Sequence, residues 1–137
     1  MCRGVYTVKK YLVIHCSDTP NDRDVKTEEI HQWHLDRGWD GIGYNLVIER
    51  NGQWQPGRPD YWTGSHVKGH NSESIGICLV GRDEFTDMQM QTLDSYIAYY
   101  TARYPGIEVV GHRDLDSNKT CPNFDVKHYL NTGGVKA

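Results

Sequence analysis

Short apolar runs alternate with polar segments along this chain, and each run predicts a buried strand. The runs cover residues 11–14, 44–48, 75–80 and 109–110. After the second run, Asn51-Gly52 is a dipeptide typical of a tight hairpin turn, so we expect a further strand at residues 53–55. The runs are short and are bounded by turn residues, which favours strands over helices.

Helical patterns occupy three other segments, over residues 27–37, 86–104 and 125–130. Thr27 is placed to cap the first helix, with two glutamates in its first turn. Thr86 and Gln89 have the spacing of a capping box at the start of the second helix. Strands interleaved with helices predict an α/β fold, in which a central mixed β-sheet is flanked by helices. The length suits a single domain over residues 1–137, and we expect a monomer.

Composition and charge narrow the possible partners. Fifteen Lys and Arg residues face eighteen Asp and Glu residues, so the net charge of -3 gives no reason to expect nucleic acid as a partner. No apolar stretch approaches the roughly 20 residues that span a bilayer. The first residues do not have the pattern of a signal peptide, so we expect synthesis in the cytoplasm. In that reducing setting the four cysteines are not expected to form a disulfide framework.

Two of the predicted strands end in the same way, with an apolar run followed by a histidine. These histidines are His15 and His112. If the strands are parallel neighbours, their carboxyl ends lie at one edge of the sheet, and the two imidazoles meet there. Cys121 follows His112 by nine residues. Two imidazoles and one thiolate can bind Zn²⁺ and leave a fourth position open, as in catalytic zinc sites. The alternative is that both histidines are ordinary loop residues and Cys121 is a buried thiol.

Two more side chains can serve such a site. Tyr44 opens a predicted strand after a glycine-containing loop, and its phenol can orient a water at the metal. Lys119 comes two residues before Cys121, and its ammonium group can stabilise an oxyanion. The alternatives are a tyrosine that packs within a strand and a solvated loop lysine.

Other histidines and cysteines have simpler explanations. His31 and His34 are three residues apart on a predicted helix and can in principle share a metal, although a packing role is the alternative. Cys16 and Cys78 lie beside or within predicted strands, where a free cysteine behaves as a small core residue. Cys2 is expected to be an exposed thiol without a function.

Short motifs in a fixed order run over nearly the whole chain. They are Val13-Ile14-His15-Cys16-Ser17, Gln32-Trp33-His34, Gly38-Trp39, Gly43-Tyr44-Asn45, Gly64-Ser65-His66, Lys68-Gly69, Asn71, the segment 74–81, Gly111-His112-Arg113 and Lys119-Thr120-Cys121-Pro122. In content and order they resemble the N-acetylmuramoyl-L-alanine amidase family, which includes the amidase-type phage lysozymes and the peptidoglycan recognition proteins. The small phage enzymes share the greatest likeness.

The resemblance implies roles for individual residues. His15, His112 and Cys121 match the zinc ligands of the family, so one Zn²⁺ per chain is expected. Tyr44 and Lys119 match the two catalytic residues. Metal-binding histidines must be neutral, so we expect activity to fall in acid.

The resemblance also implies a substrate. The family's groove positions are matched by His66, Asn71, Arg58 and Trp39. The expected partner is bacterial peptidoglycan, and the expected reaction is hydrolysis of the amide that joins the lactyl group of the glycan to L-alanine of the stem peptide. A phage or prophage endolysin of this kind would act on the cell wall after its release.

Other functions remain open at this point. Some family members bind peptidoglycan without cutting it, but these lack the cysteine ligand, whereas Cys121 is present here. Relatives that recycle wall fragments tend to use aspartate as the third ligand. A cysteine peptidase would use Cys121 as nucleophile and His112 as base, without a metal. Cell-wall cysteine peptidases usually place the cysteine before the histidine, which is the reverse of the order here.

Overall fold

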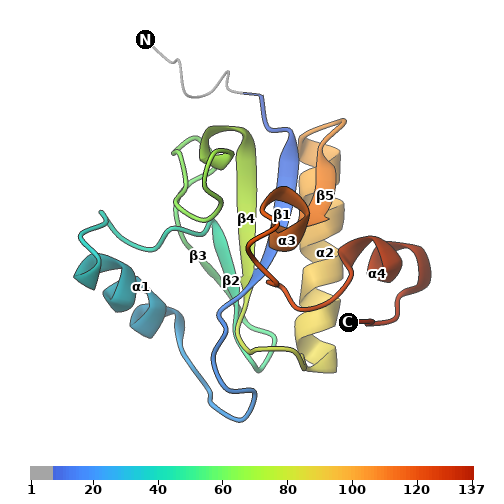
Figure 1. The fold of residues 1–137 in the computed structure, drawn as a ribbon, viewed down its shortest axis with the longest axis horizontal. Coiled ribbons are helices and arrows are strands. Elements are labelled where there is room, and N and C mark those ends of the chain that lie inside the picture. The colour runs from blue at the N-terminus through green and yellow to red at the C-terminus, as the bar shows by residue number, and fades with distance from the viewer. Residues whose placement is uncertain (1–7) are drawn as a thin grey trace.

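Five strands within residues 8–137 form one mixed sheet. The computed structural model describes residues 8–137, and its strand order is β3-β2-β4-β1-β5 (Figure 1). The strands are β1 Tyr11–Cys16, β2 Leu46–Ile48, β3 Trp54–Pro56, β4 Ser74–Leu79 and β5 Glu108–Gly111. Strand β1 is parallel to β4 and β5, β2 is parallel to β4, and β3 is antiparallel to β2. The predicted α/β fold with a central mixed sheet is therefore confirmed.

Helices cover both faces of the sheet. They are α1 Thr27–Asp36, α2 Asp87–Arg103, α3 His112–Leu115 and α4 Val126–Thr132, with a 3-10 turn, η2, at Asn71–Glu73. The long helix α2 runs behind the strands in Figure 1, and the short α3 lies in front of β1. None of the helices within residues 8–137 is long and apolar enough to cross a membrane.

Alternation along β1 divides its side chains between two cores. Leu12 and Ile14 pack with Leu93 of α2 in the larger core. Val13 packs on the other face, with Val110 of β5. Because side chains two residues apart share a face of a strand, His15 lies on the same face as Val13. The site histidine therefore projects away from the core that α2 covers.

Capping begins α2 and α4 where the sequence predicts. The Thr86 hydroxyl accepts a hydrogen bond from the Gln89 backbone N–H at 3.1 Å, and the Gln89 side chain accepts one from the Thr86 N–H at 2.9 Å. Asp125 caps α4 through a bond from the His128 N–H at 3.0 Å. Both caps satisfy backbone donors that have no partner within the helix.

The start of α1 differs from the prediction. Thr27 is the first helical residue, and Lys26 is the N-cap. The backbone N–H and the hydroxyl of Thr27 both donate to Glu49, at 2.9 and 2.7 Å. Glu49 is only 4% exposed, so its buried carboxylate requires these donors. The hydroxyl that the sequence assigns to a cap is used in a tertiary contact instead.

Two further differences concern element length. The strand predicted at residues 44–48 is shorter, since β2 begins at Leu46 and Tyr44 lies in the preceding loop. The carbonyl of Tyr44 accepts a hydrogen bond from the Arg58 N–H at 2.9 Å, which ties that loop to the segment after β3. The short elements α3 and η2 were not predicted, because four and three residues are too few to show a period.

Gln89 gives a stability prediction for the core. Its side chain is fully buried, and its amide nitrogen donates to the carbonyls of Ile48 and Val80 at 3.2 and 2.8 Å. Gln89→Leu keeps the volume but removes the amide donor from both carbonyls and leaves the Thr86 N–H without its partner. The Ile48 carbonyl keeps the Val80 N–H as a donor, and the Val80 carbonyl keeps the Arg50 guanidinium. We expect a loss of about 1–3 kcal/mol in the free energy of unfolding, measured by urea denaturation, because one buried donor is left unpaired.

The matched control is Gln91→Leu, the same change at an exposed position of the same helix. A surface substitution of this kind should change the free energy of unfolding by about 0.5 kcal/mol or less. Equal unfolding midpoints for the two variants would show that the buried amide contributes nothing to stability.

Candidate metal centre and its groove

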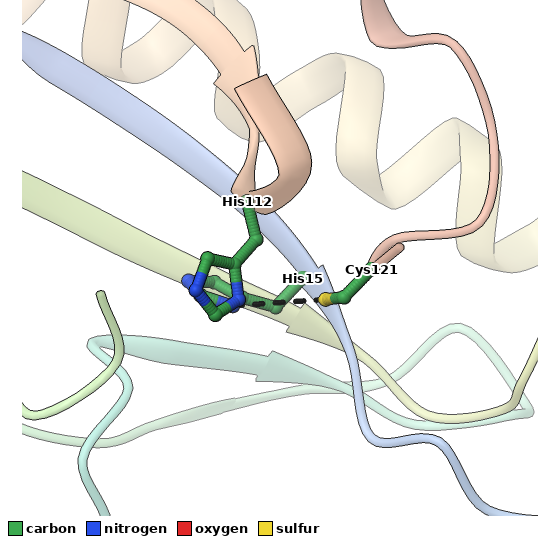
Figure 2. A group of neighbouring side chains, drawn as sticks. All are labelled: His15, His112 and Cys121. Atoms are coloured by element: carbon green, nitrogen blue, oxygen red, sulfur yellow. Dashed lines mark hydrogen bonds between the residues drawn. The ribbon is translucent and has the colours of Figure 1, made fainter. Parts of the chain in front are cut away.

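Neighbouring strands bring the three predicted ligands together. His15 is the penultimate residue of β1, and His112 directly follows the last residue of β5. The two strands are parallel and paired, with Ile14 opposite Gly111, so both histidines leave the same edge of the sheet. Cys121 reaches this edge from the loop between α3 and α4 (Figure 2). The sequence prediction that His15 and His112 meet at the carboxyl ends of parallel neighbours is confirmed.

The spacing of the three side chains fits a tetrahedral metal ion. The candidate ligand atoms of His15, His112 and Cys121 all lie within 4.8 Å of one another. The His15 Nδ1 atom is 3.8 Å from the Cys121 sulfur, and the two imidazole centroids are 4.6 Å apart. A tetrahedral zinc ion at ordinary bond lengths separates a bound nitrogen from a bound sulfur by about 3.6 Å. Within residues 8–137, this is the one group of three or more His, Cys, Asp or Glu side chains with such proximity.

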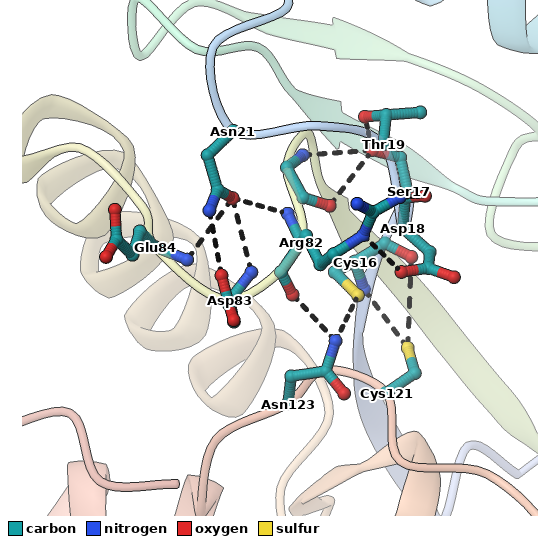
Figure 3. Close-up of polar contacts among 11 residues, drawn as sticks. Cys16, Ser17, Asp18, Thr19, Asn21, Arg82, Asp83, Glu84, Cys121 and Asn123 are labelled. Carbon is teal, nitrogen blue, oxygen red and sulfur yellow. Dashed lines mark hydrogen bonds and ion pairs between the residues drawn. The ribbon is translucent and has the colours of Figure 1, made fainter.

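Hydrogen bonds hold the Cys121 thiol in place. The contact with the Cys16 side chain and burial raise the pKa of the Cys121 thiol. The backbone N–H of Cys16, which donates to the sulfur at 3.1 Å, acts in the opposite direction. Two residues further on, the Asn123 amide donates to the Arg82 carbonyl at 2.7 Å and lies 3.6 Å from the Cys16 sulfur (Figure 3). Asn21 in turn accepts from the Arg82 N–H at 2.8 Å. The loops after β1, β4 and α3 are thereby fixed to one another around the candidate ligand.

Burial keeps the two histidines in the form that binds metal. It is the main cause of a pKa well below the ordinary value at His15, where His66 and His112 act in the same direction. Burial also lowers the pKa of His112, although Asp116 acts in the opposite direction and Lys119 adds a smaller lowering effect. Neutral imidazoles with a free lone pair are the form that ligates a cation.

Tyr44 stands beside this cluster because α1 holds the loop that carries it. The imidazoles of His31 and His34 accept hydrogen bonds from the backbone N–H groups of Ile42 and Gly43, at 3.1 and 2.8 Å. The Tyr44 ring then lies with its centroid 5.1 Å from that of His15. Burial, more than the neighbouring thiols, raises the pKa of Tyr44 well above its ordinary value, so the phenol is a donor at neutral pH.

These bonds also give His31 and His34 a structural role. Their Nδ1 atoms accept from the backbone of the 42–43 segment. Both rings therefore help to hold this segment in place. His34 does more than pack, since it lines the groove and its ring lies 4.6 Å from that of Trp39. Its helical position gave no sign of that role.

A groove of about 900 Å³ opens over the cluster. Besides the three candidate ligands, it is lined by Tyr44 and Lys119 and by three of the four predicted groove residues: Trp39, His66 and Asn71. Lys119 is exposed within it. The fourth predicted residue, Arg58, lines a different cavity, between β2, β3 and α2. Its guanidinium donates to the carbonyls of Ile42 and Thr63, at 3.0 and 2.8 Å.

Two of the groove residues use their polar atoms within the protein. The Asn71 side-chain oxygen accepts hydrogen bonds from the backbone N–H groups of His66 and Val67, at 2.9 and 2.8 Å. The His66 ring lies between His15 and Ser74, with its nitrogens 2.8 and 3.2 Å from their polar atoms. Burial is the main cause that lowers the pKa of His66 to about 3, so its ring is neutral. Substrate contacts for these two residues stay predictions.

The remaining cysteines lie where the sequence predicts. Cys16 is 4% exposed and Cys78 is fully buried, as expected for small core residues. Cys16 also lines the groove and supports the Cys121 sulfur, a contact that its place in an apolar run did not reveal. Cys2 lies outside the described residues.

The fold and the cluster define a small α/β protein with a candidate three-ligand metal centre at the carboxyl edge of its sheet. Residues 6–124 match the family described as N-acetylmuramoyl-L-alanine amidase, and the chain belongs to that family. It is 40% identical over 126 residues to the endolysin of Klebsiella phage KP32, an overlap of 86% of this chain and 83% of that one. It is 39% identical over 126 residues to the endolysin of Escherichia phage T7, with the same coverage of each chain.

A solved structure agrees with these sequences. The N-acetylmuramoyl-L-alanine amidase LysC from Clostridium intestinale superposes with a TM-score of 0.79 at 27% identity, covering 92% of this chain and 88% of that one. Family and relatives together support an endolysin amidase that acts on peptidoglycan. They favour this activity over the alternative of a cysteine peptidase that uses Cys121 and His112.

Proposed function

We propose that this protein is a zinc-dependent N-acetylmuramoyl-L-alanine amidase of the endolysin type. The observation that carries the proposal is the His15, His112 and Cys121 cluster, whose ligand atoms lie within 4.8 Å of one another on the wall of a groove. Two imidazoles and a thiolate leave one tetrahedral position open, which distinguishes catalytic from structural zinc sites. All the groups belong to one chain, so a monomer suffices.

A zinc ion held by these residues would supply a Lewis acid and a bound water of lowered pKa. Two residues beside it would have separate roles in the reaction. The Tyr44 phenol stays protonated and can orient a water or the substrate carbonyl by a hydrogen bond. The ammonium of Lys119, exposed in the groove, can stabilise the oxyanion that develops when the amide carbonyl is attacked.

The groove also accounts for a substrate with both sugar and peptide parts. Trp39 and His34 offer two neighbouring rings on its wall, tilted by 56° to one another, and aromatic rings pack against the apolar faces of sugars. Arg37 and Lys68 line the same groove with positive charge, which complements the carboxylates of a stem peptide. We propose that peptidoglycan lies along this surface with the scissile amide at the cluster.

The test of the proposal identifies the bond that is cut. Purified sacculi treated with the protein should gain new free amino groups on alanine, while the glycan strands remain intact. A muramidase would instead need two opposed carboxylates and would create reducing sugar ends. Both end types are assayed in the same digest. New reducing ends without new alanine amino termini would overturn the amidase assignment.

Elemental analysis of the same preparation tests the metal. We expect about one zinc per chain, because the cluster supplies one set of three ligands. A preparation that cuts sacculi at full rate with no metal detectable would refute the zinc-dependent mechanism while leaving the amidase assignment intact.

A further inference from the structure

His66 makes its shortest side-chain contact with a candidate ligand, not with the open groove. Its Nδ1 atom lies 2.8 Å from the Nε2 atom of His15. Both residues are buried, with His66 9% exposed and His15 1% exposed. The other nitrogen of His15, Nδ1, is the one near Cys121, at 3.8 Å from the sulfur. The two nitrogens of His15 therefore face two different partners.

The hydrogen bond between the rings constrains where the proton of His15 resides. At 2.8 Å the two facing nitrogens form a hydrogen bond, so one of them must donate and the other accept. If Nδ1 of His15 is to keep its lone pair for a cation beside Cys121, then Nε2 must carry the proton and donate it to His66. His66 would then carry its own proton on Nε2 and donate it to the Ser74 hydroxyl, 3.2 Å away.

The position of the His66 ring is built into the fold. A Cβ atom added at Gly76 of β4 would lie 2.7 Å from the His66 Nδ1, and one added at Gly64 would lie 2.7 Å from its Cδ2. Both distances are shorter than any van der Waals contact, so the two glycines leave the space that the ring fills. Asn71 fixes the backbone from the other side by accepting from the His66 N–H at 2.9 Å.

We propose that His66 is a positioning residue that selects the tautomer of His15 with its proton on Nε2, and so directs the Nδ1 lone pair toward the metal position beside Cys121. The inference rests on the proposed zinc site, and it gives His66 a role other than the substrate contact that the family resemblance implies. Partners of this kind fix both the ring orientation and the tautomer of a metal-binding histidine.

Two variants of nearly equal shape separate the hydrogen bond from packing. His66→Asn places an amide oxygen close to the position of the ring Nδ1 and can still accept from His15, whereas His66→Leu cannot. Zinc affinity is measured by competition with a chromophoric chelator, and folding is checked by circular dichroism. We expect His66→Leu to bind zinc about 10- to 100-fold more weakly than wild type, and His66→Asn to recover most of that loss.

A measurement on the wild type needs no variant. In the zinc-loaded protein, ¹H–¹⁵N NMR of the imidazole of His15 should show the proton on Nε2 and the metal on Nδ1. The opposite tautomer would overturn the inference, as would equal zinc affinity in wild type and a folded His66→Leu. If the wild type binds no zinc at all, both the proposed zinc-dependent function and the role of His66 are wrong. If it binds zinc but shows the other tautomer, only the role of His66 is wrong.

Discussion

Replacing Cys121 with alanine is expected to remove the zinc and to lower the rate of wall hydrolysis at least about a thousandfold. The sulfur is one of only three candidate ligands, and two imidazoles alone make a weak site. The electrostatic stabilisation that a catalytic metal gives the transition state is worth several kcal/mol, and every 1.36 kcal/mol is about tenfold in rate. Zinc content and turnover on sacculi are measured on the same sample.

Cys78→Ala is the matched control for this change. Cys78 is fully buried in β4 and lies outside the cluster, so this variant should retain its zinc. Wild-type protein stripped of metal by a chelator should lose activity to the same extent as Cys121→Ala and regain it on addition of Zn²⁺. If the stripped protein cuts at full rate and a thiol-alkylating reagent abolishes that activity, Cys121 is a nucleophile and the metal reading is wrong.

Replacement of Lys119 or Tyr44 should have a different signature, with zinc retained and turnover lost. Neither side chain belongs to the ligand cluster, although both line the groove. Removing one group that stabilises an oxyanion typically costs about 10²- to 10³-fold in turnover. We therefore expect Lys119→Ala and Tyr44→Phe to fall in that range with an unchanged zinc content and thermal stability.

The controls remove the same chemical groups elsewhere. Lys127→Ala deletes an exposed lysine that pairs with Glu108, away from the groove, and Tyr99→Phe deletes a hydroxyl from an exposed tyrosine of α2. Both should turn over at the wild-type rate. If Tyr44→Phe also turns over at the wild-type rate, Tyr44 is a packing residue. If Lys119→Ala does so, the Lys119 ammonium group is solvated and takes no part in catalysis.

The order of the elements and much of the site followed from local sequence patterns. Apolar runs identified the strands, and the side chains of Thr86 and Gln89 began α2, because these features depend on neighbours within a few residues. The two histidines could be paired in advance because each follows an apolar run, and parallel strands end at a common edge. Residue type and sequence distance made Cys121 and Lys119 candidates, but the motif likeness was needed to assign their roles, since a loop has no period from which to derive their positions.

Tertiary structure alone decided the contacts that join distant segments. No periodicity indicates that the Thr27 hydroxyl binds Glu49 instead of capping its helix, or that Arg58 lies outside the groove. Likewise, His66 reaches His15 across 51 residues only because β4 presents Gly76 beneath its ring. Hydrophobic pattern determines which face of an element is buried. Which polar atoms then meet depends on the order and register of the strands, and that order is set by packing between segments far apart in the chain.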